Sequence, residues 1–325
     1  MERGPIFIGG LERSGTSLMY ALLASHPNIA MTRRTNLWRY FADQYGDLAD
    51  DANLDRCLAK LRRYKRIAKV DVDFVRLRAD FIEGERSYGR LFGLLEEQAA
   101  EREGKARWGD KSLNIERYTP RLMAAYPGAR VLHMIRDPRD RFASVLARWK
   151  QRRGDVGAGT AAWLWSAQLA REYVEAFPGQ YRVVRYEDLA ADPVGELGDI
   201  CAFIDEPFDP GMLSMQGAGG FRDGGSNSSY GPRDVGVIAP DSIGKFRSVL
   251  SPRQISVIQH LAGDQLSAFG YDIEDVKLAP AQTARLWAID LPYFHSVNMM
   301  WRARGLVRGA RGERLPDYRL IADTS

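Results

Sequence analysis

The sequence predicts an α/β fold with a central, mainly parallel β-sheet. Short apolar runs that suit buried strands, Ile6–Ile8, Val131–Ile135 and Tyr181–Val184, alternate with longer segments in which apolar residues recur at helical spacing. A strand that is buried on both faces is a continuous apolar run, and strands that alternate with helices build parallel sheets. Polar residues follow each of the three runs, so we expect them at one edge of the sheet.

The first elements can be placed in order along the chain. After the first strand, a helix over Ser17–Ser25 should end at His26-Pro27, because the residue before a proline disfavours helical backbone. Ile29–Met31 and Ala106–Trp108 suit two further short strands. Between them, the charge-rich residues 33–105 show helical spacing and predict a helical insertion. Its expected inner positions are Leu58, Leu61, Tyr64, Leu91, Leu94 and Leu95.

The later helices are predicted from the same spacing. They cover Ile115–Tyr126, Phe142–Lys150, Ala161–Phe177, Val194–Ile204 and Pro252–Phe269. Residues 215–236 contain seven glycines and predict a long loop that is either a lid or disordered. We expect residues 1–277 to form one domain.

Residues 278–325 are expected to form an extension. The stretch Trp287–Trp301 is too apolar for a free tail, so it should dock on the body of the chain or on a second copy in a homodimer. The arginines at 302, 304, 308, 311 and 314 could bind an acidic membrane surface. A solvated or packed terminal helix is the favoured alternative.

Composition narrows the class of protein. With 325 residues, 45% of them hydrophobic and 27% charged, the chain suits a globular protein, and no apolar run has the roughly 18 residues of a membrane span. The N-terminus shows no secretory signal pattern, and the only cysteines are Cys57 and Cys201. These features predict a cytoplasmic protein without a disulfide framework or a cysteine-rich metal site. A net charge of +4 suits an anionic ligand but is too small to indicate nucleic acid.

A glycine-bounded loop joins the first strand to its helix. Gly10 and Gly15 have the spacing of the glycines in the phosphate-binding pattern G-x-x-x-x-G-K-[ST], but Thr16 occupies the lysine position and Ser17 follows it. Such a loop presents backbone N–H groups and a positive helix end to an anion. The loop therefore predicts a site for a phosphate-like group without the lysine that an ATP-using loop requires.

Four polar clusters should meet at the carboxyl edge of the sheet, where ligands of open α/β sheets bind. They are Arg13–Ser17, Arg136–Asp140, Arg185–Asp188 and the region of Lys111. Ser144 lies eight residues after Arg136, and Arg148 four residues after Ser144, so the last two share a helix face. Two guanidinium groups and a hydroxyl can converge there on one phosphate. Asp137 and Asp140 are expected to hold the turn and orient the arginines.

Three motifs resemble those of the sulfotransferases that use 3′-phosphoadenosine 5′-phosphosulfate (PAPS), in particular the tyrosylprotein and many bacterial members. They are GGLERSGTSLMYALLASHP, VLHMIRDPRDRFASVLARWK, and RVVRYEDLAADP followed by DSIGKFRSVLSPRQ. They occur in the family's order between Ile6 and Pro252. The resemblance implies a three-layer fold like that of P-loop NTPases, and sulfuryl transfer to a hydroxyl or amine without a metal.

The resemblance also implies roles for individual residues. Arg13, Ser14, Gly15, Thr16 and Ser17 would hold the 5′-phosphosulfate, and Arg136, Ser144 and Arg148 the 3′-phosphate. Tyr186 would stack on the adenine, and Ser242 and Lys245 lie in a segment that closes over the nucleotide. Lys111 matches a lysine that stabilises the transferring group, so Lys111, Arg13 and Asp110 form the expected catalytic set.

The general base is not identified by the resemblance. Tyrosylprotein sulfotransferases carry a catalytic Glu about twenty residues after the loop arginine, but the sequence has no Asp or Glu between Glu12 and Asp43. The candidates are Asp110, Glu116, His26 and His133, of which Asp110 is preferred because it neighbours Lys111. Alternatively, the acceptor group is acidic enough to lose its proton without a general base. Arg33 and Arg34 are candidates to contact an anionic acceptor, with a solvated surface as the alternative.

Two other functions are compatible with these features. One is an ATP-dependent small-molecule kinase, and the other is a non-catalytic nucleotide-binding protein on a sulfotransferase scaffold. The sequence does not identify the acceptor, which could be a small molecule, a peptide or a glycan.

Overall fold

A parallel sheet forms the centre of the molecule in the computed structural model, which describes residues 3–149, 156–218, 236–238, 240–297 and 299–300. Within these residues the strand order is β2-β3-β1-β4-β5, and every neighbouring pair is parallel. The strands are β1 (Ile6–Gly9), β2 (Ile29–Arg33), β3 (Arg107–Lys111), β4 (Arg130–Ile135) and β5 (Tyr181–Arg185). The predicted parallel sheet is confirmed.

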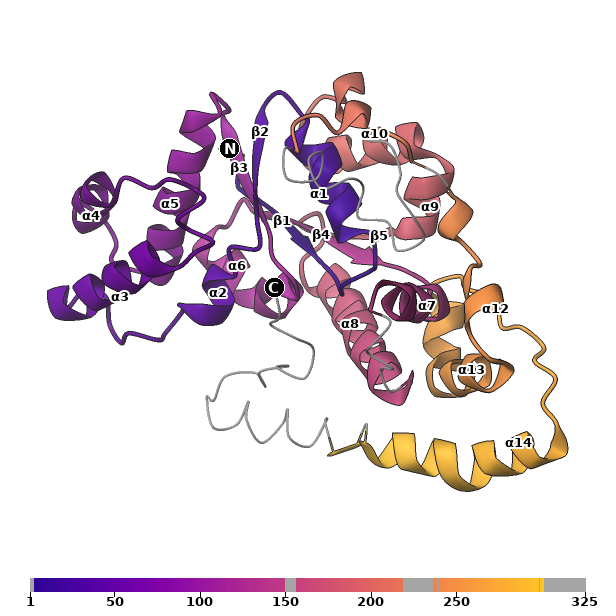
Figure 1. Cartoon of the computed structure of the whole chain (residues 1–325). Helices are drawn as coiled ribbons and strands as arrows, with labels where there is room; N and C mark the ends of the chain where they lie inside the picture. Colours follow the sequence, from indigo (N-terminus) through magenta and orange to yellow (C-terminus); the bar gives the residue numbers. More distant parts are fainter. Residues whose placement is uncertain (1–2, 150–155, 219–235, 239, 298, 301–325) are drawn as a thin grey trace.

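Helices cover both faces of the sheet (Figure 1). On one face, Ile8 and Leu132 pack with residues of α1 (Thr16–Ala24), α9 (Tyr186–Ala191) and α10 (Pro193–Phe203). On the other face, Phe7 and Val131 pack with residues of α5 (Tyr88–Arg102) and α6 (Thr119–Ala125), and α8 (Val156–Ala176) lies beside them. The result is the three-layer α/β arrangement that the sequence predicts.

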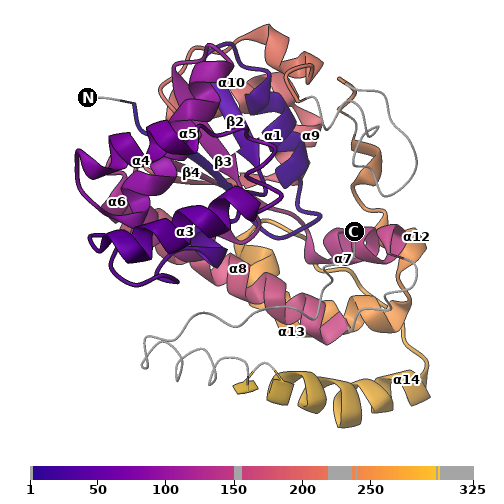
Figure 2. The same cartoon turned by 60° about the vertical axis from the view of Figure 1, so that its left-hand side comes forward.

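The segment between β2 and β3 is helical. It contains α2 (Leu37–Tyr40), α3 (Asp51–Arg63), α4 (Phe74–Ile82) and α5. Side chains of Asp50, Asp73 and Ser87 accept hydrogen bonds from the first N–H groups of α3, α4 and α5, which explains where these helices begin. The predicted inner leucines are buried or half-buried. Figure 2 shows α3 and α4 at the outside of this side of the sheet.

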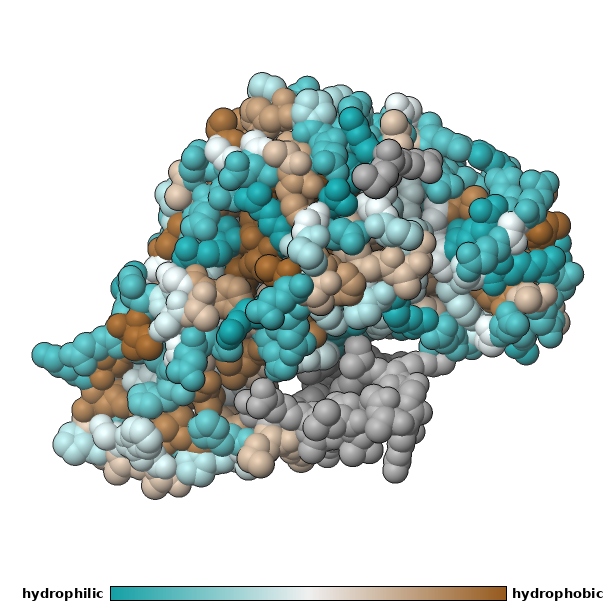
Figure 3. Space-filling view, turned by 180° about the vertical axis from the view of Figure 1, so that it is seen from behind, coloured by the Kyte–Doolittle hydropathy of each residue, from teal (hydrophilic) through white to brown (hydrophobic). Residues whose placement is uncertain are grey.

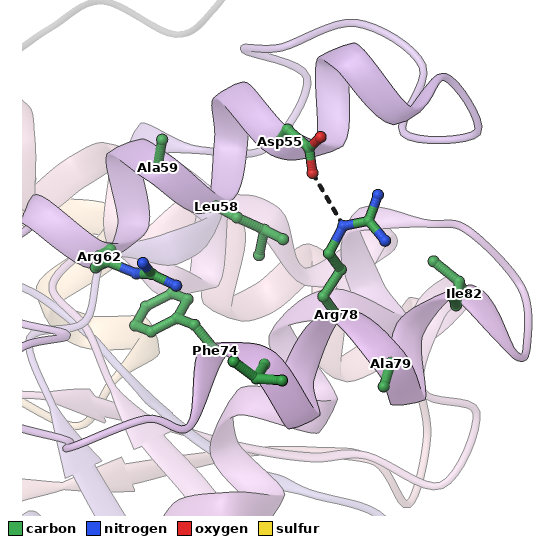
Figure 4. A pocket seen from close by; sticks show the side chains of 9 residues that line it. Asp55, Leu58, Ala59, Arg62, Phe74, Arg78, Ala79 and Ile82 are labelled. Atoms are coloured by element: carbon green, nitrogen blue, oxygen red, sulfur yellow. Dashed lines mark hydrogen bonds and ion pairs between the residues drawn. The ribbon is translucent and has the colours of Figure 1, made fainter.

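A shallow groove separates α3 from α4 (Figure 4). Its lining is mostly apolar, and Arg78 forms an ion pair with Asp55 across it at 3.0 Å. The lining residues are Asp55, Leu58, Ala59, Arg62, Phe74, Val75, Arg78, Ala79 and Ile82. None of them follows a sheet strand, so the groove is separate from the sheet edge where the polar clusters meet.

The C-terminal part packs beside α7 (Pro138–Arg148) and α8. It contains the 3₁₀ turns η2 (Pro210–Ser214) and η3 (Pro240–Ser242), the helices α12 (Phe246–Val249), α13 (Pro252–Ala268) and α14 (Pro280–Arg285), and the π-helical turn η4 (Leu286–Asp290). Residues 219–235 of the predicted loop lie outside the described residues, as do the arginines at 302–314.

The apolar part of the extension has one buried side and one exposed side. Leu286, Leu291 and Phe294 are buried in a cluster with Phe142 and Ile258. The other side of the same segment exposes Trp287, Ile289 and Tyr293, each by more than half of its surface. Figure 3 shows hydrophobic side chains at the surface over this segment, at the lower left. No helix of the described residues is long and apolar enough to cross a membrane.

Several element boundaries differ from the sequence-based expectation; for example, β2 continues to Arg33 and α8 begins at Val156 rather than Ala161. β3 continues to Lys111, so Asp110 and Lys111 belong to the strand. The predicted helix Ile115–Tyr126 is divided into the 3₁₀ turn η1 (Ile115–Tyr118) and α6, because Pro120 starts a new first turn. α7 begins at Pro138 rather than Phe142, since the Asp137 carboxylate accepts a hydrogen bond from the Arg139 N–H at 2.8 Å and caps the helix.

Gly10 is required where β1 turns into the loop. Its φ is 110°, and a Cβ built there would lie 2.3 Å from the carbonyl oxygen of Met134 in β4. We predict that Gly10→Ala lowers the free energy of unfolding by at least about 2 kcal/mol, because backbone strain adds to this close contact. Urea unfolding measures the effect. Gly104→Ala is the control, since Gly104 also has a positive φ (65°) but has no atom within 4 Å of such a Cβ; it should lose only about 1 kcal/mol. Equal losses would contradict the steric explanation.

Candidate functional site

The loop between β1 and α1 leads directly into the N-terminus of α1. Gly10 and Gly15 adopt positive φ angles, and so does Arg13, at 68°. No side chain caps the N-terminus of α1. The positive end of this helix therefore faces the loop, as an anion-binding site requires.

Arg13 and Ser144 meet across the site. Arg13 Nε donates a hydrogen bond of 3.0 Å to Ser144 Oγ, although the two residues are 131 positions apart in the chain. Ser144 is buried in α7, and Arg148 follows it one turn later, exposed at the end of the same helix. The structure thus brings the loop beside the helix that carries two residues of the predicted 3′-phosphate site.

Arg136 joins the loop to two other segments. Its guanidinium donates to the carbonyl oxygens of Arg13 (3.2 Å) and Ser242 (2.7 Å). The same group lies 4.4 Å from the centroid of the Tyr186 ring, and the Tyr186 hydroxyl is 2.6 Å from Ser242 Oγ. A Cβ on Gly15 would lie 2.7 Å from the Tyr186 ring. These contacts pack residues of all three sequence motifs into one cluster.

The two aspartates of the second motif accept hydrogen bonds from backbone N–H groups. Asp140 accepts hydrogen bonds from the N–H groups of Gly244 (2.6 Å) and Phe246 (2.8 Å), and so ties the segment around Lys245 to α7. Asp137 caps α7 and pairs with Arg139 at 2.7 Å. Among the residues that the structure describes, no three His, Cys, Asp or Glu side chains are grouped as a metal site would need.

The residues of the Arg185–Asp188 cluster have different partners. Tyr186 reaches Arg136, whereas Arg185 pairs with Asp188 at 3.4 Å and lies over the ring of Tyr271. Glu187 accepts a hydrogen bond of 3.0 Å from the Asp137 N–H, so Tyr186 and Glu187 both contact the second motif, whereas Arg185 does not join these contacts.

Lys111 ends β3 on the same side of the sheet as the loop. It is 1% exposed and is the register partner of Arg33 in β2. Burial lowers the pKa of its ammonium group to about 7, and the charges of Arg33 and Arg34 contribute to this shift. Among the described residues Lys111 has no ion-pair partner, which is unusual for a buried charge.

Asp110 points to the opposite face of the sheet from Lys111, because successive side chains of a strand alternate. Its carboxylate accepts a hydrogen bond of 3.2 Å from Thr32 Oγ1 and is 3% exposed. Burial raises its pKa to about 6. Beside it, Glu96 of α5 is fully buried, its carboxyl oxygens have no hydrogen-bond partner, and burial followed by the charge of Asp110 raises its pKa. Asp110 and Glu96 therefore form a buried pair behind the β2–β3 edge.

Sequence reasoning missed Glu96. Its position in the chain contains one usable signal, since it lies four residues after Phe92 and seven after Gly89, both buried on α5. Glutamate is rare at helix positions whose spacing predicts burial, so this position could have been singled out from the sequence.

The other candidate bases are engaged in structural hydrogen bonds. Glu116 accepts from the Gly10 N–H at 2.9 Å and so supports the loop. His133 lies between the hydroxyls of Tyr181 (2.5 Å) and Ser166 (2.9 Å). His26 contacts the Pro207 carbonyl at 2.9 Å and accepts from the Asn28 N–H. In the loop itself, Glu12 pairs with the buried Arg141 at 2.9 Å.

Comparison with known proteins connects this geometry to one family. A model of the sulfotransferase family matches residues 5–210, the part that contains the loop, the sheet and α7. The chain belongs to the sulfotransferase family. The resemblance read from the three motifs is thereby confirmed.

Individual relatives agree with this sulfotransferase assignment. Protein-tyrosine sulfotransferase A of Caenorhabditis elegans is 26% identical over 218 residues, which cover 64% of this chain and 51% of that protein. The chain thus spans about half the length of this relative. The sulfotransferase domain of the Synechococcus PCC 7002 olefin synthase has a TM-score of 0.57 at 21% identity over 83% of this chain and 95% of that one. The sulfotransferase domain of the curacin biosynthetic pathway has a TM-score of 0.55 at 20% identity, over 84% and 99%. These two likenesses concern the fold, and they confirm the predicted P-loop-like architecture.

The buried lysine of this sulfotransferase should make stability depend on pH. The pKa of Lys111 is depressed from 10.5 to about 7 in the folded chain, so the unfolded chain binds more protons between these values. The free energy of unfolding of the ligand-free protein should therefore rise as the pH increases through this window, by up to roughly 1.4 kcal/mol per pH unit, and fall as the pH drops toward 7. Chemical denaturation at a series of pH values measures this slope.

Lys111→Met should flatten that slope, because the titrating group is gone. Lys277→Met, which removes an exposed lysine, serves as the control and should leave the slope as in the wild-type chain. A wild-type slope that persists in Lys111→Met would show that another group titrates.

Proposed function

We propose that this sulfotransferase moves a sulfuryl group from PAPS to a hydroxyl or amine of an acceptor. The observation that carries the proposal is the cluster of Arg13, Arg136, Ser144, Tyr186 and Ser242 around an uncapped helix end. This cluster suits a nucleotide that carries phosphate groups at both the 3′ and the 5′ position of its ribose. Family membership over residues 5–210 supports the same reaction class.

The loop residues are proposed to hold the 5′-phosphosulfate. Ser14 and Thr16 are buried, and Arg13, Gly15 and Ser17 are half-buried around the start of α1. The helix end and the guanidinium of Arg13 supply positive charge to the anionic oxygens.

Arg136, Ser144 and Arg148 are proposed to hold the 3′-phosphate. The Nε atom of Arg136 is buried and has no hydrogen-bond partner, so one donor of this guanidinium is available to a ligand. Tyr186, which lies under Arg136, would contact the adenine, and Ser242 and Lys245 would close over the nucleotide on a segment tied down by Asp140.

The proposed chemistry is an in-line displacement at sulfur. The acceptor oxygen or nitrogen forms a bond to sulfur while the bond between sulfur and the bridging oxygen breaks, and the acceptor loses its proton. The products are the sulfated acceptor and adenosine 3′,5′-bisphosphate. Lys111 and Arg13 would stabilise the negative charge that develops on the bridging and leaving oxygens, so catalysis comes mainly from positioning and electrostatics.

Asp110 is proposed as a positioning residue rather than as the group that takes the acceptor's proton. Its carboxyl lies on the far face of the strand and accepts from Thr32 of β2. Through that contact it would hold the end of β2, and with it Arg33, in place. The cytoplasmic location expected from the sequence belongs to the same proposal, and the two buried free cysteines are consistent with it.

Nucleotide binding discriminates this function from its alternatives. Arg148→Ala should weaken the binding of adenosine 3′,5′-bisphosphate by about tenfold or more, since a charge-assisted phosphate contact is lost, and should leave 5′-AMP binding unchanged. Isothermal titration calorimetry measures both ligands. Arg171→Ala, an exposed arginine of α8, is the matched control and should change neither. Equal weakening of both nucleotides in Arg148→Ala would contradict the 3′-phosphate assignment.

The reaction itself is tested by mass spectrometry of an acceptor panel incubated with PAPS. Sulfated products support the transferase. Tight bisphosphate binding without any product would favour the non-catalytic scaffold, and stabilisation by ATP with Mg²⁺ but not by the bisphosphate would favour the kinase. Thr16 in the lysine position argues against the kinase.

A further inference from the structure

Positive charge accumulates beside the proposed donor site. Arg33 lies opposite Lys111 in the strand register, and the N–H of Arg34 donates to the Lys111 carbonyl at 2.8 Å. Burial lowers the pKa of Arg33 and of Arg34, and the charge of Arg66, which lies between α3 and α4, lowers both further. Four cations from three segments of the chain therefore share the space at the carboxyl ends of β2 and β3.

The charges of Asp110 and Glu12 act on Lys111 from a distance, but neither carboxylate forms an ion pair with it. Among the residues that the structure describes, none of the four forms an ion pair with Asp or Glu. The acidic groups nearest to them are already engaged, since Glu12 pairs with Arg141, Glu103 pairs with Lys105 at 3.0 Å, and Asp110 lies on the far face of the sheet. Lys111 is buried and Arg33 and Arg66 are half-buried, whereas Arg34 is exposed. Cations that are withdrawn from water without counter-charges are costly, and a bound anion would remove that cost.

Arg33 is held ready for such an anion. Its guanidinium lies 5.5 Å from the centroid of the Tyr20 ring, which fixes its plane, while its Nε is buried without a hydrogen-bond partner. Planar guanidinium groups bind carboxylate, phosphate and sulfate oxygens through paired N–H donors.

The backbone of this segment is strained. Arg34 and Asn36 have φ angles of 60° and 51°, in the left-handed region that residues with a Cβ rarely adopt. Strain of this kind persists only where the surroundings impose it. Here the hydrogen bonds from Arg34 N–H to Lys111 and from Asn36 N–H to Ser112 Oγ (2.9 Å) hold the turn, and so hold Arg34 beside Lys111.

We propose that the acceptor is itself an anion, and that Arg33 and Arg34 bind its carboxylate, phosphate or sulfate group beside the donor. This inference rests on the proposed function, because it takes Arg13 and Lys111 as partners of the donor's phosphosulfate. Those two cations are then neutralised by the donor, whereas Arg33, Arg34 and Arg66 are not. A neutral alcohol would leave all three uncompensated.

The adjoining part of the insertion is also positively charged. Residues 56–70 contain seven Lys and Arg and no Asp or Glu, and Lys65 and Lys69 are exposed. A patch of one sign raises the local concentration of oppositely charged ligands and speeds their arrival. The insertion between β2 and β3 would therefore attract an anionic acceptor toward Arg66 and Arg33.

The test measures anion binding while the donor position is filled. The protein is saturated with a PAPS analogue in which a methylene group replaces the bridging oxygen, so that the sulfonate occupies the sulfuryl position and cannot be transferred. Sodium sulfate is then titrated by calorimetry at constant ionic strength kept with chloride. The wild-type complex should bind one sulfate. Arg33→Gln and Arg34→Gln should each weaken this binding by about tenfold. Arg33→Lys should retain part of it, and Arg171→Gln should match the wild type.

The outcomes separate the acceptor inference from the proposed function. If the analogue binds but sulfate does not, or if both glutamine variants bind sulfate as the wild type does, the acceptor inference is overturned and the donor assignment stands. If the analogue fails to bind the wild-type chain, the donor assignment falls and the inference falls with it. Unchanged analogue affinity in Arg33→Gln and Arg34→Gln confirms that these variants remain folded at the donor site.

Discussion

The guanidinium of Arg136 connects the segments that form the site. It donates to the carbonyl of Arg13 in the loop and to that of Ser242 before α12, and it lies over the ring of Tyr186 at the start of α9. Trp163 of α8 donates to the Arg136 carbonyl at 2.8 Å and holds its backbone. Segments far apart in sequence thus depend on one side chain at the end of β4, because a planar group with five donors can satisfy several acceptors at once.

The parallel sheet decides where the charges lie. All its strands end at one edge, so the loop, Lys111, Arg136 and Tyr186 meet there. The alternation of side chains along each strand then sorts neighbours in sequence to opposite faces. Lys111 and Arg33 lie on the side of α1, and Asp110 and Thr32 lie on the side of α5. The α1 side of the sheet therefore keeps the positive charges of Lys111 and Arg33, while the carboxyls of Asp110 and Glu96 lie on the α5 side.

The elements with strong local signals could be predicted well. β1, β4 and β5 are apolar runs between turn residues, and the spacing of Ser144 and Arg148 requires only that α7 be a helix. The end of β3 was harder to predict, because Gly109, Asp110 and Lys111 do not look like a strand locally. They extend one because β1 and β2 supply hydrogen-bond partners on both sides. Long-range pairing of this kind leaves no trace in a short window of sequence.

The sequence by itself determined the class of fold, the glycine-bounded loop and the family resemblance, because these depend on local spacing of glycines, apolar residues and arginines. Only the tertiary structure decided which charged groups face one another. It separated Asp110 from its neighbour Lys111, paired Glu12 with Arg141, placed Glu96 against Asp110, and left Arg33 and Arg34 beside the buried Lys111. Electrostatic partnership depends on distance and burial in space, and a linear sequence does not contain either quantity.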